Sequence, residues 1–420
     1  MKKISIIATA IIALASCTGL PRVLVSTDIG GTDPDDNQSM AHLLMYSDKV
    51  ALEGLVSTPS YGDGSAAEIL RMIDLYEQDF PLLKAVYPGL TEPDRLRAIT
   101  KQGRHGMPAW KGYAESTEGS NWIVKCARKP SRKPLWILVW GGLEDLAQAL
   151  HDAPDIKDNI KVHWIGGPNK KWGNAAYTYI VRNFPDLWMI ENNASYRGFI
   201  GDANAPGHYQ NAYYADCIEG AGALGKDFGG YLGGNLKMGD TPSLLYLMDG
   251  DPEDPCGESW GGSFERMDLS PISIFRRDLT VCDTIPEYSI MEVFYEGPDT
   301  DCPEDEPCFT VTIDSQVWPG YRTGPGEFAF RYSPKRPETL EYVIESEMLP
   351  WLDGRTGRFV ASVAWPDAAR SNAPVSVGPD WFTDKSAPDL FHKDLQGYGT
   401  VSKWRPAVLD DWAERWKALK

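Results

Sequence analysis

The stretch RVLVSTDIGGTDPDDNQSMAHLL, residues 22–44, joins a short apolar run to an acidic loop and then to a helical pattern. Residues 22–27 are mostly apolar, as in a buried strand, and from about residue 36 Met40, Leu43 and Leu44 recur with helical spacing. Four aspartates lie close together between the two patterns, namely Asp28, Asp33, Asp35 and Asp36. Carboxylates this close repel one another unless a cation lies among them or water screens them on an exposed turn.

Apolar runs and amphipathic patterns alternate along the next part of the chain. We expect strands over 50–57, 135–140, 161–167 and 187–190, and helices over 66–78, 143–151 and 175–183. This order predicts an α/β fold with a mostly parallel sheet flanked by helices, in which ligands bind at the carboxyl ends of the strands. The acidic loop, WGGLED (140–145) and IGGPNKKWGN (165–174) follow strands directly, so we expect them at that edge.

The pattern changes near residue 271, where apolar runs follow one another without helices between them. We expect a β-rich insertion over 271–337, with disulfides among the cysteines of this region, Cys256, Cys282, Cys302 and Cys308. After it, a helix over 338–352, a strand over 358–365 and a helix over 405–420 are expected. Residues 18–270 and 338–420 would then form one α/β domain around the insertion.

The first residues have the features of a secretory signal peptide. Two lysines precede an apolar stretch from Ile4 to Ala15, which is too short to span a membrane, and small residues lead to Cys17. The ending LASC looks like a bacterial lipobox, in which the cysteine is lipidated and becomes the mature N-terminus. We therefore expect a lipoprotein of the cell envelope, anchored to the membrane through Cys17. An ordinary signal peptide with an incidental cysteine is the alternative.

Composition narrows the classes of partner. The 420 residues are 42% hydrophobic and carry a net charge of −18, which argues against nucleic acids and anionic membranes as partners. The charge suits a hard cation held by carboxylates. The 15 Trp and 19 Tyr are many, and aromatic side chains in secreted proteins often stack on sugar rings, although core packing accounts for most of them.

Four segments carry a resemblance to a known family. DIGGTDPDD resembles the DxDxGxDD signature of nucleoside hydrolases, and more closely the TDIGG-DPDD form of secreted bacterial nucleoside-hydrolase-like proteins of unassigned function. Three later segments are similar to family motifs in the same order: VWGGLEDLAQAL (139–150), WIGGPNKKWGN (164–174) and MGDTPSLLYL (238–247). The resemblance covers residues 22–262 and implies a nucleoside hydrolase-like fold.

The resemblance also implies a calcium site. Its ligands would be Asp28, Asp36, Asp240 and the backbone carbonyl of Trp140. Calcium takes six to eight oxygens, which leaves room for a water and two substrate hydroxyls. Asp35 matches the general base that takes a proton from this water as it attacks the anomeric carbon. The alternative for the acidic loop is a solvated turn.

Substrate contacts are less sharply defined by the sequence. Asn169 and Asn174 follow the IGG turn, where the family grips the sugar, but Asn also forms turns. Trp260 would stack on a base or sugar ring, or pack in the core. Where the family has a sugar-contacting Asn after the second strand, this chain reads STPSYGDGS, with Ser60 or Asp63 as substitutes.

The proton donor for the leaving group is also open. Relatives often have His immediately before the late aspartate, but this chain has Gly239. Candidates elsewhere are His105, His208 and Glu265, each of which could equally be structural.

Two classes of function follow. The first is a calcium-dependent glycosyl bond hydrolase that cleaves an N- or O-glycosidic bond of a nucleoside or saccharide in the cell envelope. The second is a carbohydrate-binding envelope lipoprotein with little or no turnover. Retention of the aspartates favours the hydrolase, because binding alone has no need for Asp35. The oligomeric state stays open.

Overall fold

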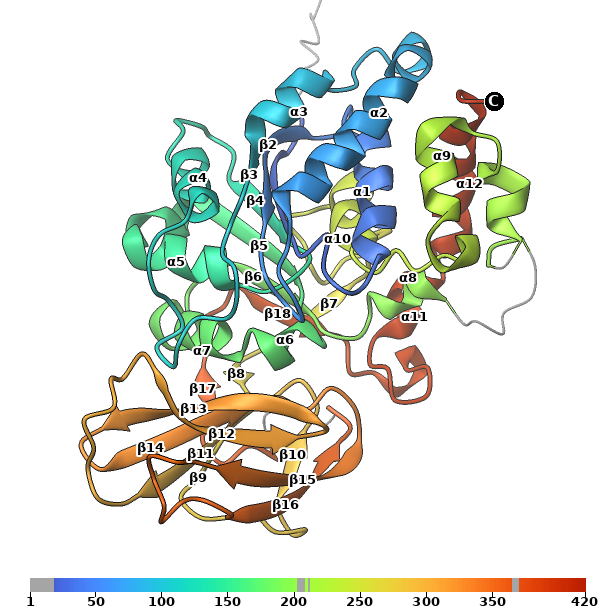
Figure 1. Cartoon of the computed structure of the whole chain (residues 1–420). Coiled ribbons are helices and arrows are strands. Elements are labelled where there is room, and N and C mark those ends of the chain that lie inside the picture. Colours follow the sequence, from blue (N-terminus) through green and yellow to red (C-terminus); the bar gives the residue numbers. More distant parts are fainter. Residues whose placement is uncertain (1–18, 202–207, 211, 365–369) are drawn as a thin grey trace, which may run out of the picture.

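The computed structural model describes residues 19–201, 208–210, 212–364 and 370–420. They form two eight-stranded sheets and one two-stranded sheet (Figure 1). The expected signal peptide and Cys17 lie outside the described residues. Among the described helices, none combines the length and the apolar character needed to cross a membrane.

The first sheet is the expected parallel α/β sheet. Its strand order is β3-β2-β1-β4-β5-β6-β18-β7, and all neighbours are parallel except β7, which runs antiparallel to β18. The strands are β1 (Arg22–Thr27), β2 (Ala51–Ser57), β3 (Thr100–Lys101), β4 (Leu135–Val139), β5 (Ile160–Ile165), β6 (Met189–Asn192), β7 (Phe264–Arg266) and β18 (Trp381–Asp384). The α/β fold class is therefore confirmed.

Helices cover both faces of this sheet (Figure 1). They are α1 (Asp35–Met45), α2 (Ala66–Val86), α3 (Pro93–Ile99), α4 (Glu118–Ala127), α5 (Glu144–Asp152), α6 (Asn169–Trp172), α7 (Asn174–Asn183), α8 (Arg197–Ile200), α9 (Gly222–Gly229), α10 (Thr241–Met248), α11 (Tyr398–Ser402) and α12 (Arg405–Lys417). Short 3₁₀- or π-helical segments are η1 (Pro154–Asn159), η2 (Tyr214–Ile218), η3 (Leu232–Gly234) and η5 (Pro388–Leu390). Because side chains alternate along a strand, Val23 and Val25 of β1 join one apolar core and Leu24 joins the other.

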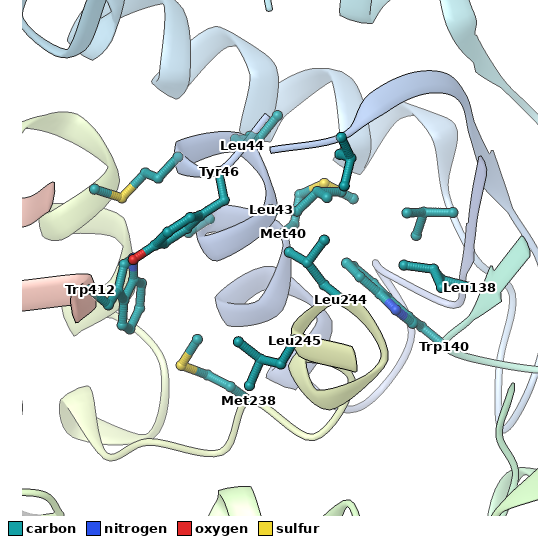
Figure 2. Close-up of a cluster of buried hydrophobic side chains, with 14 of the residues drawn as sticks. Met40, Leu43, Leu44, Tyr46, Leu138, Trp140, Met238, Leu244, Leu245 and Trp412 are labelled. Atoms are coloured by element: carbon teal, nitrogen blue, oxygen red, sulfur yellow. The ribbon is translucent and has the colours of Figure 1, made fainter. Parts of the chain in front are cut away.

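One of these cores lies directly behind the acidic loop. Figure 2 shows Met40 and Leu43 of α1 packed with Leu244 of α10 and Trp140, which follows β4. All four side chains are buried, and burial of each large apolar side chain contributes about 1.5–3 kcal/mol. This packing holds α1 beside α10, so the aspartate that precedes α10 can reach the acidic loop.

The second sheet is the expected β-rich insertion. Its strand order is β10-β16-β15-β12-β13-β14-β11-β9, and it encloses an apolar core of its own. The strands are β9 (Ile272–Phe275), β10 (Thr284–Pro286), β11 (Ile290–Glu296), β12 (Pro307–Ile313), β13 (Gln316–Gly324), β14 (Glu327–Tyr332), β15 (Glu338–Glu345) and β16 (Thr356–Ser362). Two short strands, β8 (Leu269–Ser270) and β17 (Val375–Ser376), pair with each other where the chain enters and leaves this sheet.

The expected helix over 338–352 is wrong. Residues 338–345 form β15, in which Leu340, Tyr342 and Ile344 point into the core and the residues between them are exposed. This alternation has the period of a strand, and the two neighbouring strands complete it. The second sheet therefore extends to Ser362, beyond residue 337, and the chain rejoins the first sheet at β18.

The expected disulfides are not formed among the described residues. The six cysteines after Cys17 are free thiols. Cys256 and Cys282 are exposed, whereas Cys302 and Cys308 are buried in the second sheet. The clustering of cysteines in sequence therefore does not translate into bridges in this structure.

An ion-pair network joins the two sheets. Glu292 of β11 is fully buried and accepts hydrogen bonds from Arg331 Nε of β14 at 2.7 Å and from Arg182 Nη2 of α7 at 2.7 Å. The guanidinium of Arg331 also lies 3.5 Å from the ring centre of Trp110. These contacts fix the second sheet against the last turn of α7.

Candidate active site

A cavity of about 700 Å³ opens at the carboxyl ends of the first-sheet strands. Its lining comes from the β1–α1 loop, the segment that leads into α6, the start of α8, the segment before α10, the turn after β14 and the segment before α11. The second sheet thus completes a cavity that the first sheet begins. Five of the lining residues are aspartates: Asp28, Asp33, Asp35, Asp36 and Asp240.

Local hydrogen bonds shape the acidic loop. The Thr27 hydroxyl, at the end of β1, donates to Asp36 Oδ1 and accepts from the Ile29 amide at 3.1 Å. Gly30 has a left-handed φ of 88°, which glycine adopts without strain. Asp35 and Asp36 form the first turn of α1, where the helix dipole favours carboxylates.

Contacts between α1 and the segment before α10 bring the late aspartate into the cavity. Gln38 Oε1 accepts a hydrogen bond from the Lys237 amide at 2.7 Å. Ser243 Oγ of α10 donates to the Asp240 carbonyl at 2.8 Å and accepts from Trp140 Nε1 at 2.7 Å. Asp240 is therefore held between α1 and the end of β4.

The aspartates converge on one point. Carboxylate oxygens of Asp35, Asp36 and Asp240 all lie within 4.8 Å of one another. Asp36 and Asp240 are 3% exposed, whereas Asp28 and Asp35 are half-buried. Asp28 shares a hydrogen bond with Asp36, so it adjoins the same cluster. Asp240 Oδ2 is buried and has no hydrogen-bond partner among the described residues.

Burial and mutual repulsion disturb the ionisation of this cluster. Burial raises the pKa of Asp28 to about 6, although its hydrogen bond with Asp36 opposes the rise. Burial and repulsion from Asp240 and Asp28 raise the pKa of Asp36 well above its usual value. The pKa of Asp35 is also raised, by burial and by Asp33, with Lys237 opposing the rise. The protein alone therefore does not neutralise the negative charge that these groups carry when ionised.

The residues of this cluster fit a hard divalent cation. All donors are oxygens, as calcium prefers, and the unpartnered Asp240 Oδ2 is a vacant acceptor. Trp140 lines the cavity, and its carbonyl accepts a hydrogen bond from Asn169 Nδ2 at 3.3 Å. The three most tightly grouped carboxylates include Asp35 in place of the expected Asp28.

Asn169 lines the cavity, but Asn174 does not. Asn169 Oδ1 accepts from Ser60 Oγ at 2.6 Å, and its Nδ2 also donates to the Ile165 carbonyl at 3.0 Å, so the amide is held in one orientation. Asn174 begins α7, and its Nδ2 donates to the Lys171 carbonyl at 3.0 Å. That bond stabilises the turn between α6 and α7.

The structure does not bring the other sequence candidates into the cavity. His105 is exposed, and its Nδ1 lies 3.3 Å from Asp63 Oδ2 at the surface. Trp260 packs against the core behind the acidic loop. His208 is paired with a surface aspartate, and Glu265 lies in β7. None of these four side chains lines the cavity.

Several cavity residues had no role in the sequence analysis. They are Tyr61, Trp172, Tyr196, Arg197, Lys237, Lys335, Arg336, His392, Lys393 and Tyr398. Trp172 and Lys237 lie within or beside the recognised motifs, so their proximity to the site could have been inferred. The residues from 335 onward reach the cavity only because the second sheet and the C-terminal segment pack there, and no local sequence signal shows this.

Residues 22–264 match the family described as "Cellulose-binding Sde182, nucleoside hydrolase-like domain". The chain belongs to this family. No curated protein matches the chain at a significant level.

The chain is also similar to solved structures. One is a nucleoside hydrolase-related hypothetical protein from Saccharophagus degradans that is associated with carbohydrate metabolism. It is 18% identical with a TM-score of 0.50, and the match covers 82% of this chain and 100% of that one. An inosine-uridine preferring nucleoside hydrolase from Bacillus anthracis is 14% identical with a TM-score of 0.38, over 60% of this chain and 86% of that one. The family match and the fold shared with the Saccharophagus degradans protein confirm the expected nucleoside hydrolase-like identity at the level of family and fold.

Gly239, where the resemblance to nucleoside hydrolases leads us to expect a histidine, lies directly beside Asp35. A Cβ atom at this position would lie 2.9 Å from Asp35 Oδ2, closer than such atoms approach. Any side chain at this position would therefore displace the Asp35 carboxylate. Glycine leaves the Asp35 carboxylate room beside Asp240.

Proposed function

We propose that this protein is a calcium-dependent glycosidase that hydrolyses an N- or O-glycosidic bond of a saccharide or nucleoside. The observation that carries the proposal is the group of three carboxylates, Asp35, Asp36 and Asp240, within 4.8 Å of one another in a large cavity. The nucleoside hydrolase-like family supports it.

Each aspartate has a distinct task in this proposal. Asp28, Asp36, Asp240 and the Trp140 carbonyl would hold the calcium ion. When bound, the ion supplies positive charge that keeps the carboxylates ionised and makes water a stronger acid. Asp35 accepts a proton from the water that attacks the anomeric carbon, a contribution worth roughly 10²–10⁴ in rate.

The leaving group needs a proton from another wall of the cavity. His392 is the histidine that lines this cavity, and its ring stacks on Tyr398 with ring centres 4.6 Å apart. We place the donor in this pair, because the three earlier candidates lie elsewhere.

Aromatic side chains favour a saccharide over a nucleoside. Tyr61 is 52% exposed, and its ring centre lies 4.9 Å from that of Trp172. Both residues also line a second hollow of about 420 Å³, which continues over Met107 to Val317 and Trp318 of β13. The exposed ring of Tyr61 and the half-buried ring of Trp172 lie where the two hollows adjoin, an arrangement that suits a chain of sugar rings stacked on them. A nucleoside would leave the second hollow empty.

A carbohydrate-binding protein with little turnover is the second candidate. The family description names cellulose binding, and the Saccharophagus degradans protein is associated with carbohydrate metabolism. The two functions differ in what they need from Asp35, because a binding site gains nothing from a general base.

The experiment that tests the proposal is a hydrolysis screen of the purified protein. Nucleosides, aryl glycosides and oligosaccharides, both neutral and acidic, are incubated with the protein in calcium chloride or in EGTA. We expect product from at least one glycoside, loss of product in EGTA, recovery with added calcium, and loss in Asp35→Asn. Saccharide binding without any product, in the wild type, would favour the binding protein instead.

We also propose that the protein is anchored in the cell envelope by a lipid on Cys17. The signal peptide features of residues 1–17 support this proposal. In the source cell, Cys17→Ala should move the protein from the membrane fraction to the soluble fraction, whereas Cys217→Ala should not. Retention of Cys17→Ala in the membrane fraction would contradict lipid anchoring.

A further inference from the structure

The cavity has a basic wall as well as an acidic one. Arg197, Lys335, Arg336 and Lys393 line it together with the aspartates, although the whole chain carries a net charge of −18. These cations come from α8, the turn after β14 and the segment before α11, so three separate parts of the chain converge. Building on the proposed function, we propose that Arg197, Lys335 and Lys393 form a subsite for an anionic group of the substrate. The substrate is then an acidic glycoside that carries a carboxylate, sulfate or phosphate.

Arg197 is the central residue of this subsite. It is half-buried, and its Nε donates to the Tyr196 hydroxyl at 3.3 Å. Within the described part of the chain, no carboxylate oxygen lies within 4.0 Å of its guanidinium, and its two Nη groups make no hydrogen bond. Half-buried donors without partners cost free energy that a bound anion would recover. The planar guanidinium is suited to two-point contacts with carboxylate, sulfate or phosphate.

Glu287, one of the acidic groups near Arg197, carries little negative charge at neutral pH. Glu287 is 4% exposed, and burial raises its pKa to about 8, so most of it is protonated at neutral pH. Lys237 differs in this respect, because it forms an ion pair with Asp33 on the acidic wall. Arg197 therefore presents a net positive charge to the cavity.

Lys335 and Lys393 extend the positive wall. The ammonium group of Lys335 lies 5.3 Å from the ring centre of Trp172. Among the described residues, no carboxylate oxygen lies within 4.0 Å of the ammonium group of Lys335 or Lys393. Lys393 has a left-handed φ of 58°, in a turn closed by hydrogen bonds of 3.2 Å and 3.0 Å between His392 and Leu395. This conformation is uncommon for a lysine and is typical of functional positions. Arg336 is excluded from the subsite because Glu338 pairs with it at 2.8 Å.

The two walls suit the two ends of one acidic sugar. The aspartates and their cation would bind the hydroxyls beside the anomeric centre, and the basic wall would bind the anionic group. A protein of net charge −18 repels anions at long range, so a local cluster of cations is needed to admit one. A neutral sugar would leave the two Nη groups of Arg197 without a partner among the described residues.

The test is a binding experiment in the Asp35→Asn background, in calcium chloride, so that turnover does not enter. The anionic probes are methyl glucuronide, glucose 6-sulfate and glucose 6-phosphate, and methyl glucoside is the neutral reference. Inorganic sulfate is added as an anion that does not depend on sugar shape. We expect at least one anionic probe to bind about tenfold or more tightly than methyl glucoside, as for a charge-assisted pair. The carboxylate, sulfate and phosphate arms identify the anion.

Variants tie the selectivity to the basic wall. Arg197→Met and Lys335→Met should each weaken the binding of anionic probes about tenfold or more and leave the binding of methyl glucoside unchanged. Lys226 is an exposed lysine of α9 outside the cavity, so the control variant Lys226→Met should change the binding of neither probe. The proposal is overturned if no anionic probe, including sulfate, shows binding that depends on Arg197. If the protein hydrolyses neutral glycosides and does not prefer charged ones, the anion subsite is wrong but the proposed hydrolase stands. If the protein binds anionic probes selectively but hydrolyses no glycoside, the proposed hydrolase is wrong but the anion subsite stands.

Discussion

Asp35 and Asp36 are neighbours in sequence but have different surroundings. The carboxylate of Asp36 is 3% exposed and accepts a hydrogen bond from Thr27, whereas Asp35 is half-buried and borders the cavity. Their spacing was enough to predict that they lie at one strand end with Asp28. The approach of Gly239 to Asp35 could not be predicted, because it depends on how α10 packs beside α1.

Asp35→Asn should reduce turnover and leave calcium binding nearly unchanged. Asp35→Asn preserves shape but cannot accept a proton, so turnover should fall by about 10²–10⁴ while calcium affinity changes little. Asp36→Asn should weaken both calcium and substrate binding. Turnover rates and calcium affinities of the two variants test this assignment, and equal turnover in wild type and Asp35→Asn would rule out Asp35 as the base.

Even a methyl group at position 239 should disturb Asp35. In Gly239→Ala the new Cβ would lie 2.9 Å from Asp35 Oδ2, so the carboxylate must move. We expect turnover to fall more than tenfold, as for other small displacements of catalytic groups. Gly324→Ala is the matched control, since a Cβ there meets nothing within 4 Å. Full activity in Gly239→Ala would show that the position of Asp35 is not critical.

Sequence patterns predicted five strands of the first sheet, β1, β2, β4, β5 and β6, but not β3, β7 or β18, and they assigned one strand of the second sheet as a helix. Strands such as β1 and β4 are continuous apolar runs between turns, which identify buried parallel strands. The segment of β15 mixes glutamates with apolar residues, and its assignment depends on strands that lie far away in sequence. Local patterns cannot supply that information.

The start of α5 carries a buried acid beside the site. Glu144 is 1% exposed, its two carboxylate oxygens have no hydrogen-bond partner among the described residues, and burial raises its pKa to about 8. The folded state therefore keeps a proton that the unfolded state releases above its ordinary pKa of about 4.3. This difference makes the wild-type protein less stable as pH rises toward 8.

Glu144→Gln should remove this dependence on pH. Relative to wild type, the variant should gain about 1.4 kcal/mol of unfolding free energy for each pH unit between 5 and 8, with no further gain above 8. Urea unfolding of both proteins at several pH values measures this difference. A difference that stays constant with pH would mean that Glu144 is ionised in the fold.

At the scale of the whole molecule, the second sheet contributes one wall of the cavity. Lys335 follows β14, and the network around Glu292 holds β14 against the first domain. Composition and periodicity predicted the sheet but not its position. The basic wall of the cavity could therefore not be predicted from the sequence, whereas the acidic wall was predicted from a local motif.

Breaking the Glu292 network should destabilise the molecule. Glu292→Ala leaves Arg331 buried without its carboxylate, which should cost roughly 3–5 kcal/mol. Glu296→Ala on the same strand is the control, because that side chain is 80% exposed and its ion pair with Arg276 is 3.7 Å long, so a cost of about 0–1 kcal/mol is expected. Chemical unfolding compares the two variants. Equal stability would show that the network does not hold the sheets together.

Calorimetric titration of the chelator-treated protein with calcium tests whether the aspartate cluster is a calcium site. We expect one calcium ion per chain in wild type, a higher melting temperature with calcium than with EGTA, and loss of both effects in Asp36→Asn and Asp240→Asn. Absence of saturable calcium binding, together with a melting temperature that EGTA does not change, would show that the cluster is not a calcium site.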